Sequence, residues 1–365
     1  MNATHELHDA GQSLWLDNIT RELLDSGTLQ RYIDELSVTG LTSNPTIFEH
    51  AISERRDYDA AIRERTEAGE SGEALFFALA IDDLTRAADL FRPIHEATNR
   101  VDGWVSLEVS PKLAYDTEST VAAAKELSRR AARPNLFIKI PGTREGLPAI
   151  EEAIFAGVPI NVTLLFSREH YVAAAEAYLR GIERRVAAGL NPDVASVASL
   201  FISRWDVAVA KSASTVPQNT LGIAMAQRTY KAYRELLASD RWLRLLNLGA
   251  RPQRLLWAST GTKDPEASDV LYVESLAAPH TVNTIPEKTL LAFADHGEIG
   301  PMMSPDGGDA EHVLGEITRA GIDLDALAAR LQREGAAAFV KSWDELLECI
   351  VAKSTMLETA STGEP

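Results

Sequence analysis

Eight short apolar segments alternate along this chain with longer stretches rich in Ala, Leu and Glu, and this alternation constrains the fold more than any other feature. The segments span residues 14–19, 39–44, 105–110, 136–141, 158–166, 194–203, 254–260 and 281–285. Apolar runs bounded by turn residues are typical of strands buried on both faces of a parallel sheet. Strands that alternate with helices form such sheets through right-handed crossovers.

The intervening stretches have the pattern of helices that pack on a sheet. In the stretch 167–189, Ser167 is a candidate N-cap and Gly189 a candidate residue just beyond the C-cap. The apolar residues between them repeat at steps of three and four: Val172, Ala175, Leu179, Ile182 and Val186. Eight strand–helix units predict an α/β fold of the (β/α)₈ barrel type, with an open doubly wound sheet as the alternative.

The 365 residues exceed what a minimal barrel needs, and the excess can be located. About sixty residues separate the second segment from the third, enough for two or three helices, and about fifty separate the sixth from the seventh. An amphipathic helical extension follows the eighth segment. No linker rich in Pro, Gly or Ser divides the chain, so we expect a single domain over residues 1–365 with polar tails at 1–11 and 357–365.

Lys139 places an amine in the middle of the fourth segment, between apolar neighbours. An unpaired ammonium buried there would cost free energy, so the amine is expected to shift toward its neutral form. A neutral lysine amine adds to carbonyls and forms a Schiff base. The competing interpretation is a strand-end lysine whose amine reaches water.

Polar residues lie near the C-terminal ends of other segments, in several cases two residues apart and therefore on one face of a strand. They are Asp17, Thr42, Asn44, Ser106, Glu108, Asn161, Thr163 and Ser199. Each has a local alternative: Asp17 could cap a helix near Thr20, and Asn44 could form an Asx-turn before Pro45. In a (β/α)₈ barrel, however, these strand ends converge on one mouth, where active sites lie. The set predicts an active site around Lys139.

Two segments resemble the signatures of the transaldolase family. Residues 40–48 read Gly-Leu-Thr-Ser-Asn-Pro-Thr-Ile-Phe, and residues 137–141 read Phe-Ile-Lys-Ile-Pro and contain the family's Schiff-base lysine. Shorter matches lie at 15–17, 107–110, 160–166 and 199–204. The resemblance covers roughly residues 10–350 and implies a (β/α)₈ barrel of the class I aldolase type, with Lys139 on the fourth strand.

The resemblance implies transfer of a dihydroxyacetone unit from sedoheptulose 7-phosphate to glyceraldehyde 3-phosphate, a step of the pentose phosphate pathway. It implies no metal or organic cofactor, because the protonated Schiff base itself accepts the electrons. Carried over residue by residue, it makes Lys139 the nucleophile and Asp17 the group that takes the C4 hydroxyl proton, while Glu108 and Thr163 handle a water. The substrate-binding residues that it implies are Thr42, Asn44, Asn161, Ser199, Phe201 and, for the phosphate, Arg204.

The phosphate site departs from the best-known branch of the family, in which an arginine stands two residues after the serine of the seventh strand. Here Ser259 is followed by Thr260 and Gly261, so that arginine is absent. Residues 257–263 resemble another bacterial branch of the family, which implies that Lys263 supplies the missing charge and binds phosphate together with Ser259 and Arg204.

The net charge of −17 argues against nucleic acid and anionic membrane as partners, and it means that phosphorylated sugars need local cations. The sequence shows no signal peptide and no long apolar span, which predicts a cytoplasmic protein. The histidines lack metal-ligand spacing, and the single cysteine, Cys349, cannot form an intramolecular disulfide. We expect a monomer or a homodimer.

Three other functions fit parts of the pattern. Related fructose 6-phosphate aldolases release dihydroxyacetone, but they are shorter and tend to carry tyrosine where this chain has Phe201 and glutamine where it has Glu108. A non-catalytic sugar-phosphate binding barrel needs no buried amine, and an isomerase with a carboxylate base leaves Lys139 unexplained. The residues therefore favour the transferase.

Overall fold

The computed structural model describes residues 2–210 and 218–362, in which eight parallel strands close into one barrel. Each strand pairs with the next along the chain, and β8 (Thr281–Ile285) pairs with β1 (Gln12–Asp17) to close the sheet. The others are β2 (Val38–Thr42), β3 (Trp104–Glu108), β4 (Leu136–Pro141), β5 (Ile160–Leu165), β6 (Ser196–Phe201) and β7 (Gln253–Ala258). The predicted (β/α)₈ barrel is confirmed, and the open sheet is wrong.

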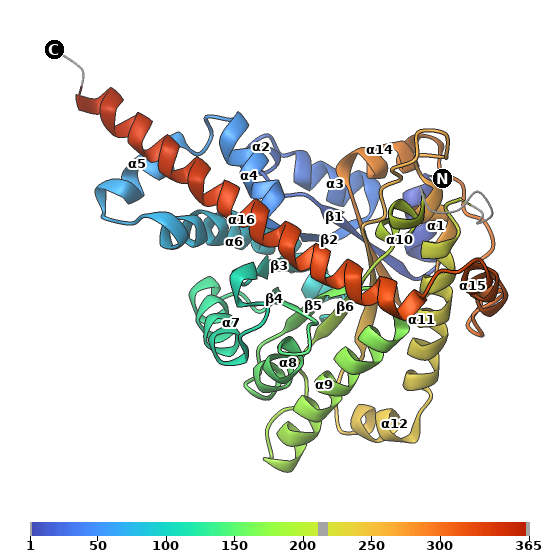
Figure 1. Cartoon of the computed structure of the whole chain (residues 1–365). Coiled ribbons are helices and arrows are strands. Elements are labelled where there is room, and N and C mark those ends of the chain that lie inside the picture. Colours follow the sequence, from blue (N-terminus) through green and yellow to red (C-terminus); the bar gives the residue numbers. More distant parts are fainter. Residues whose placement is uncertain (1, 211–217, 363–365) are drawn as a thin grey trace.

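Helices connect the strands and cover the outside of the barrel (Figure 1). They are α1 (Ala3–Asp9), α2 (Arg21–Asp25), α3 (Thr28–Leu36), α4 (Pro45–Glu54), α5 (Asp59–Glu67), α6 (Gly72–Ala97), the 3-10 helix η1 (Pro111–Leu113), α7 (Thr117–Ala131), α8 (Gly146–Phe155), α9 (Arg168–Ala187), α10 (Ser203–Val209), α11 (Leu221–Leu237), α12 (Asp240–Asn247), α13 (Leu271–Ser275), α14 (Glu287–His296), α15 (Ala310–Arg319) and α16 (Leu324–Thr362). The long insertion between β2 and β3 holds α4, α5 and α6, as the spacing predicted.

The helix α9 shows why its sequence forms this element. The side chain of Ser167 accepts the backbone N–H of His170 at 3.2 Å and so caps the first turn. The chain leaves the helix through Gly189, whose φ of +69° lies in the left-handed region that glycine adopts without strain. Both ends are therefore where the sequence predicted them.

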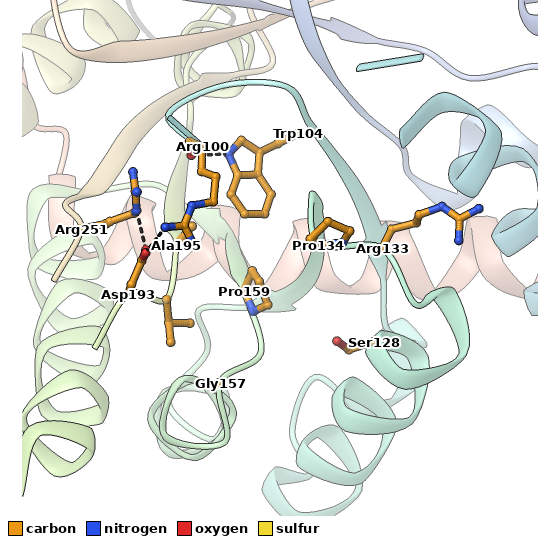
Figure 2. A pocket seen from close by; sticks show the side chains of 11 residues that line it. Arg100, Trp104, Ser128, Arg133, Pro134, Gly157, Pro159, Asp193, Ala195 and Arg251 are labelled. Carbon is orange, nitrogen blue, oxygen red and sulfur yellow. Dashed lines mark hydrogen bonds and ion pairs between the residues drawn. The ribbon is translucent and has the colours of Figure 1, made fainter. Parts of the chain in front are cut away.

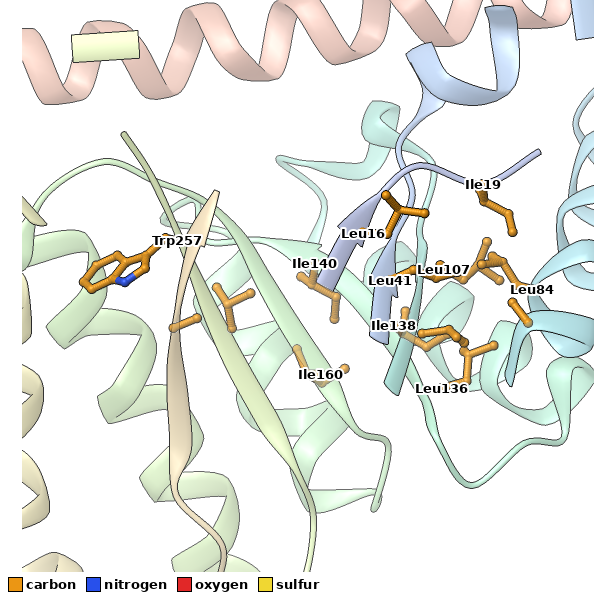
Figure 3. Packing of buried hydrophobic residues seen from close by; sticks show 14 of the residues in the cluster. Leu16, Ile19, Leu41, Leu84, Leu107, Leu136, Ile138, Ile140, Ile160 and Trp257 are labelled. Atoms are coloured by element: carbon orange, nitrogen blue, oxygen red, sulfur yellow. The ribbon is translucent and has the colours of Figure 1, made fainter. Parts of the chain in front are cut away.

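The outward faces of the strands form the larger part of the core. Figure 3 shows Leu41, Leu107 and Ile138 packing beside Leu84 of α6. Each of these residues is at most 1% exposed to solvent. Burying each such side chain stabilises the fold by about 1.5–3 kcal/mol, which is why the strands read as continuous apolar runs.

A buried polar group of Ser13, Asp102 and Arg254 lies inside the barrel near the N-terminal ends of the strands. Next to it, toward Lys139, apolar side chains form a layer. They are Trp15, Trp104, Phe137, Val197, Leu256 and Val282. The rings of Trp104 and Phe137 stack with their centroids 4.1 Å apart. Gly40 makes room for this layer, because a Cβ there would lie 2.8 Å from the indole ring of Trp15. Phe137 precedes Lys139 by two residues on the same strand face, so this apolar layer lies directly beneath the lysine side chain.

The last helix, α16, runs across the C-terminal ends of the strands (Figure 1). It contacts β5 and η1 and continues along α4 and α5. Two polar contacts anchor the middle of this helix: Thr46 Oγ1 donates to Ser342 Oγ at 2.9 Å, and Lys112 Nζ lies 2.7 Å from Asp344 Oδ1. The predicted C-terminal extension therefore covers part of the barrel mouth.

Both predicted polar tails are helical over most of their length. Residues 3–9 form α1, because Asn2 caps the helix by accepting the N–H of Thr4 and because Leu7 is completely buried. At the other end α16 continues to Thr362, and Leu357 is only 7% exposed. Met1 and residues 363–365 lie outside the described residues.

A cavity of about 320 Å³ opens at the opposite end of the barrel, near the N-terminal ends of the strands (Figure 2). Its arginines already have carboxylate partners: Asp193 pairs with both Arg100 and Arg251, and Arg133 pairs with Asp89. The predicted site residues line a different cavity. No helix within residues 2–210 and 218–362 combines the length and the apolar character that a membrane span requires.

Candidate active site

The C-terminal ends of the strands surround a cavity of about 190 Å³. Nine of the twelve predicted site residues line it: Asp17, Thr42, Lys139, Thr163, Ser199, Phe201, Arg204, Ser259 and Lys263. They come from six strands or the turns that follow them, so a closed barrel is needed to bring them together. The remaining three, Asn44, Glu108 and Asn161, lie beside this lining.

Lys139 lies deep in the barrel, where its residue is 6% exposed. Its Nζ is 3.1 Å from Glu108 Oε2 and donates a hydrogen bond to the backbone oxygen of Ser43 at 3.0 Å. Glu108 stands opposite Lys139 in the register of β3 and β4, which sets this pair. The neighbouring strand therefore supplies the buried amine with a carboxylate partner.

Glu108 is a carboxyl group held almost out of water. Burial raises its pKa, Lys139 opposes the rise, and the charge of Asp17 adds to it. Its Oε1 has no hydrogen-bond partner among the described residues, and the same holds for the buried hydroxyl of Thr163 on β5. Buried polar atoms normally have partners, so these two atoms are free to bind a water or a reacting group.

Asp17 lies at the end of β1 and is half-buried. Burial raises the pKa of its carboxyl group, whereas Lys139, the hydroxyl of Thr42 and Lys263 each lower it. Thr42 Oγ1 donates to Asp17 Oδ1 at 2.8 Å and lies 2.6 Å from Thr284 Oγ1. A hydroxyl has one hydrogen to give, so Thr284 donates to Thr42 when Thr42 donates to Asp17.

Asn161 and Ser199 form a second polar group in the barrel. Ser199 Oγ donates to Asn161 Oδ1 at 2.7 Å, and Asn161 Nδ2 donates to Ser106 Oγ at 3.1 Å. Asn161 stands opposite Lys139 in the pairing of β4 and β5. Its amide is thus held in one orientation beside the lysine.

Asn44 has a different local role. Its Oδ1 accepts the backbone N–H of Ile47 at 3.1 Å and caps α4, which begins at Pro45. This is close to the local alternative considered for the sequence, an Asx-type contact before Pro45. Asn44 is not among the residues that line the cavity.

Arg204 and Lys263 are the two exposed cations of the cavity. Within residues 2–210 and 218–362, neither forms an ion pair with a carboxylate, unlike most other arginines of this acidic chain. Between them lies Ser259, whose φ of +58° turns the chain after β7 and whose Oγ is 2.8 Å from Ser203 Oγ. Two unpaired cations beside hydroxyl groups form a suitable anion-binding site.

Phe201 separates the polar cavity from α16. Its ring lies 5.3 Å from that of Phe166 and 6.5 Å from that of Phe339, measured between centroids. Phe201 also lines a small apolar cavity with Gly335 and Phe339 of α16. These aromatic side chains therefore form the apolar side of the cavity, toward α16.

Thr284 and Pro286 also line the cavity and were not predicted from the sequence. Thr284 follows the rule that found the others, since it is polar and lies near the C-terminal end of its strand. It could have been selected on that ground.

Among the described residues, no group of three or more His, Cys, Asp or Glu side chains could hold a metal ion.

Comparisons with known proteins show the family to which the chain belongs. The family model described as transaldolase/fructose-6-phosphate aldolase matches residues 14–350. A transaldolase of Saccharopolyspora erythraea is 47% identical, covering 94% of this chain and 95% of that protein. Transaldolases of Thermobifida fusca and Mycobacterium bovis are each 46% identical, and each match covers 94% of this chain. The matches cover 96% of the Thermobifida protein and 94% of the Mycobacterium protein. The chain belongs to the transaldolase/fructose-6-phosphate aldolase family.

Proposed function

We propose that this chain is a transaldolase that moves a dihydroxyacetone unit from a ketose phosphate to an aldehyde through a Schiff base on Lys139. The observation that carries the proposal is the position of Lys139. Its amine lies over a layer of apolar side chains, beside the buried Glu108 and in the same cavity as Asp17 and two exposed, unpaired cations. A sugar phosphate fits this order, with its carbonyl at the lysine and its phosphate at the opening.

The first half of the reaction forms the Schiff base. The neutral amine of Lys139 adds to the C2 carbonyl, and the carbinolamine then loses its hydroxyl as water to give a protonated imine. Glu108 is suited to give that proton, because burial raises the pKa of its carboxyl group. Thr163, with its free hydroxyl, is suited to hold the departing water.

The second half breaks and remakes a carbon–carbon bond. Asp17 takes the proton of the C4 hydroxyl, the C3–C4 bond breaks, and its electron pair moves to the protonated imine to give an enamine. The aldehyde leaves, an acceptor aldehyde enters, and the same steps run in reverse. Thr42 keeps Asp17 in place and favours its ionised form.

Whether the enamine is transferred or released decides between a transaldolase and an aldolase. Release requires a proton at the enamine carbon, and the phenyl ring of Phe201 has none to give. The test is to incubate the enzyme with fructose 6-phosphate, with and without erythrose 4-phosphate. Sedoheptulose 7-phosphate formed with acceptor, and little free dihydroxyacetone without it, is the expected result. Rapid acceptor-independent release would instead make the chain an aldolase.

Thr42→Val is expected to move the acidic limb of the kcat–pH profile to higher pH. The valine cannot donate to Asp17, so the pKa of Asp17 rises further and the ionised base is lost at a higher pH. Activity should fall most at low pH and approach that of the wild type at high pH, whereas Thr42→Ser should keep the wild-type profile. A loss of the same factor at every pH would mean that Thr42 contacts the substrate instead.

Arg204→Ala is expected to lower kcat/KM for fructose 6-phosphate by about ten- to a hundredfold, the size of one or two charge-assisted hydrogen bonds. Lys263→Ala should have a smaller effect, and neither change should affect unphosphorylated dihydroxyacetone as a donor to the same extent. Arg168→Ala is a matched control, because Arg168 is exposed, pairs with Glu169 and lies outside the cavity. Equal losses with both kinds of donor would show that Arg204 has a structural role.

A further inference from the structure

Gln332 of α16 reaches into the barrel mouth and binds two strands at once. Its Nε2 donates to the backbone oxygen of Gly142 at 3.0 Å and to that of Leu164 at 3.0 Å. The amide has two N–H hydrogens, so each carbonyl receives one. Gly142 directly follows β4, which carries Lys139, and Leu164 directly follows Thr163 on β5. One side chain thus joins the ends of the two strands that hold the amine and the free hydroxyl.

The backbone at Leu164 needs such support. Leu164 has a φ of +59°, which lies in the left-handed region and is strained for a residue other than glycine. The register between β5 and β6 shifts between Val162 and Leu165, so the strand ladder is interrupted at this point. The bond from Gln332 satisfies a carbonyl in the interrupted stretch and holds the left-handed turn from outside the sheet.

The shape of α16 matches this contact. Gly335 lies one turn after Gln332, on the same side of the helix. A Cβ at Gly335 would be only 3.0 Å from Leu164 Cδ2 and 3.5 Å from Phe166 Cζ. The missing side chain lets the helix approach β5 closely enough for the amide to reach both carbonyls.

We propose that Gln332 is a positioning residue for the reaction. By fixing the backbone on either side of the Thr163 hydroxyl, it holds that hydroxyl at the distance from Lys139 at which the departing water is bound. This inference rests on the proposed Schiff-base function and adds a residue of the C-terminal helix to it. The competing possibility is that Gln332 only attaches α16 to the barrel.

Gln332→Glu separates the two, because it keeps the shape of the side chain and removes both donors. The carboxylate would also face two carbonyl oxygens. We expect kcat to fall by about ten- to a hundredfold, as small misplacements near the reacting atoms do, while KM for fructose 6-phosphate changes little. Single-turnover borohydride trapping should be slower. Lowering the pH should partly restore the rate relative to the wild type, since a protonated glutamate regains one donor.

Ser342→Ala is the matched control. It removes the bond between Thr46 and Ser342, another attachment of α16, without contact to β4 or β5. It should leave kcat unchanged. An unchanged kcat in Gln332→Glu, or an equal loss in Ser342→Ala, would overturn the proposal.

A readout without substrate keeps this test separate from the proposed function. The N–H of Gly142 donates to the backbone oxygen of Thr163 at 2.7 Å, so its hydrogen exchange reports the geometry of the two strand ends. Exchange at Gly142 should be faster in Gln332→Glu and unchanged in Ser342→Ala. If the wild type neither traps fructose 6-phosphate nor transfers dihydroxyacetone, the proposed function is wrong. Unaltered exchange at Gly142 in Gln332→Glu would contradict the positioning role alone.

Discussion

Lys139→Ala is expected to abolish transfer, with kcat reduced by roughly 10⁴-fold or more, because the other lysine of the cavity, Lys263, is exposed and does not lie beside Glu108 as Lys139 does. Lys139→Arg should be equally inactive, since a guanidinium stays protonated and cannot add to a ketone. The measurement is reduction with borohydride in the presence of fructose 6-phosphate, followed by peptide mapping. The wild type should carry the label on the peptide that contains Lys139, and both variants should carry none.

The variants are expected to fold, although each changes a buried ion pair. Burial already raises the pKa of Glu108, so this carboxyl group can take up a proton when the lysine is lost instead of remaining as an uncompensated charge. Circular dichroism and thermal unfolding check this point. Lys112→Ala is the control for a lysine outside the site, because Lys112 is exposed and pairs with Asp344 of α16. A label on another lysine, or trapping that persists in Lys139→Ala, would exclude the proposed mechanism.

The strands could be predicted from the sequence because barrel strands are buried on both faces and therefore leave a continuous apolar signal. β4 lies between Leu136 and Pro141, where the run and its terminating Pro-Gly indicated it. The helix α1 was missed because its signal is short: one cap at Asn2 and the buried Leu7. Its stability comes from packing on the barrel, which a local pattern does not contain.

Most residues that line the cavity could be predicted from the sequence, but the contacts between their side chains could not. Strand period and direction placed Asp17, Lys139 and Ser199 at one mouth, and closure of the barrel brings them together. The ion pair of Lys139 depends on the register of two strands. The hydrogen bonds of Gln332 depend on where α16 packs, and Gln332 follows Gly142 by 190 residues and Leu164 by 168 residues. Such distances along the chain leave no periodic trace, so these contacts required the structure.

Asp17→Asn is expected to reduce kcat by about 10²–10⁴-fold, the usual cost of losing a positioned acid/base group, while substrate is still trapped on Lys139. The variant separates Schiff-base formation from carbon–carbon cleavage, because an amide can fill the place of the carboxylate but cannot accept the C4 hydroxyl proton.

Loss of a helix cap cannot explain a loss of activity in this variant, because the helix-cap role considered for Asp17 belongs to another residue. Thr20 accepts the N–H of Leu23 at 3.1 Å and caps α2. Replacing this half-buried carboxyl group, whose pKa is raised by burial, should leave the unfolding temperature unchanged or higher. A slow but stable enzyme that accumulates the trapped intermediate therefore identifies Asp17 as the base. An active Asp17→Asn, or one that fails to form the Schiff base, would require a different base for the cleavage step.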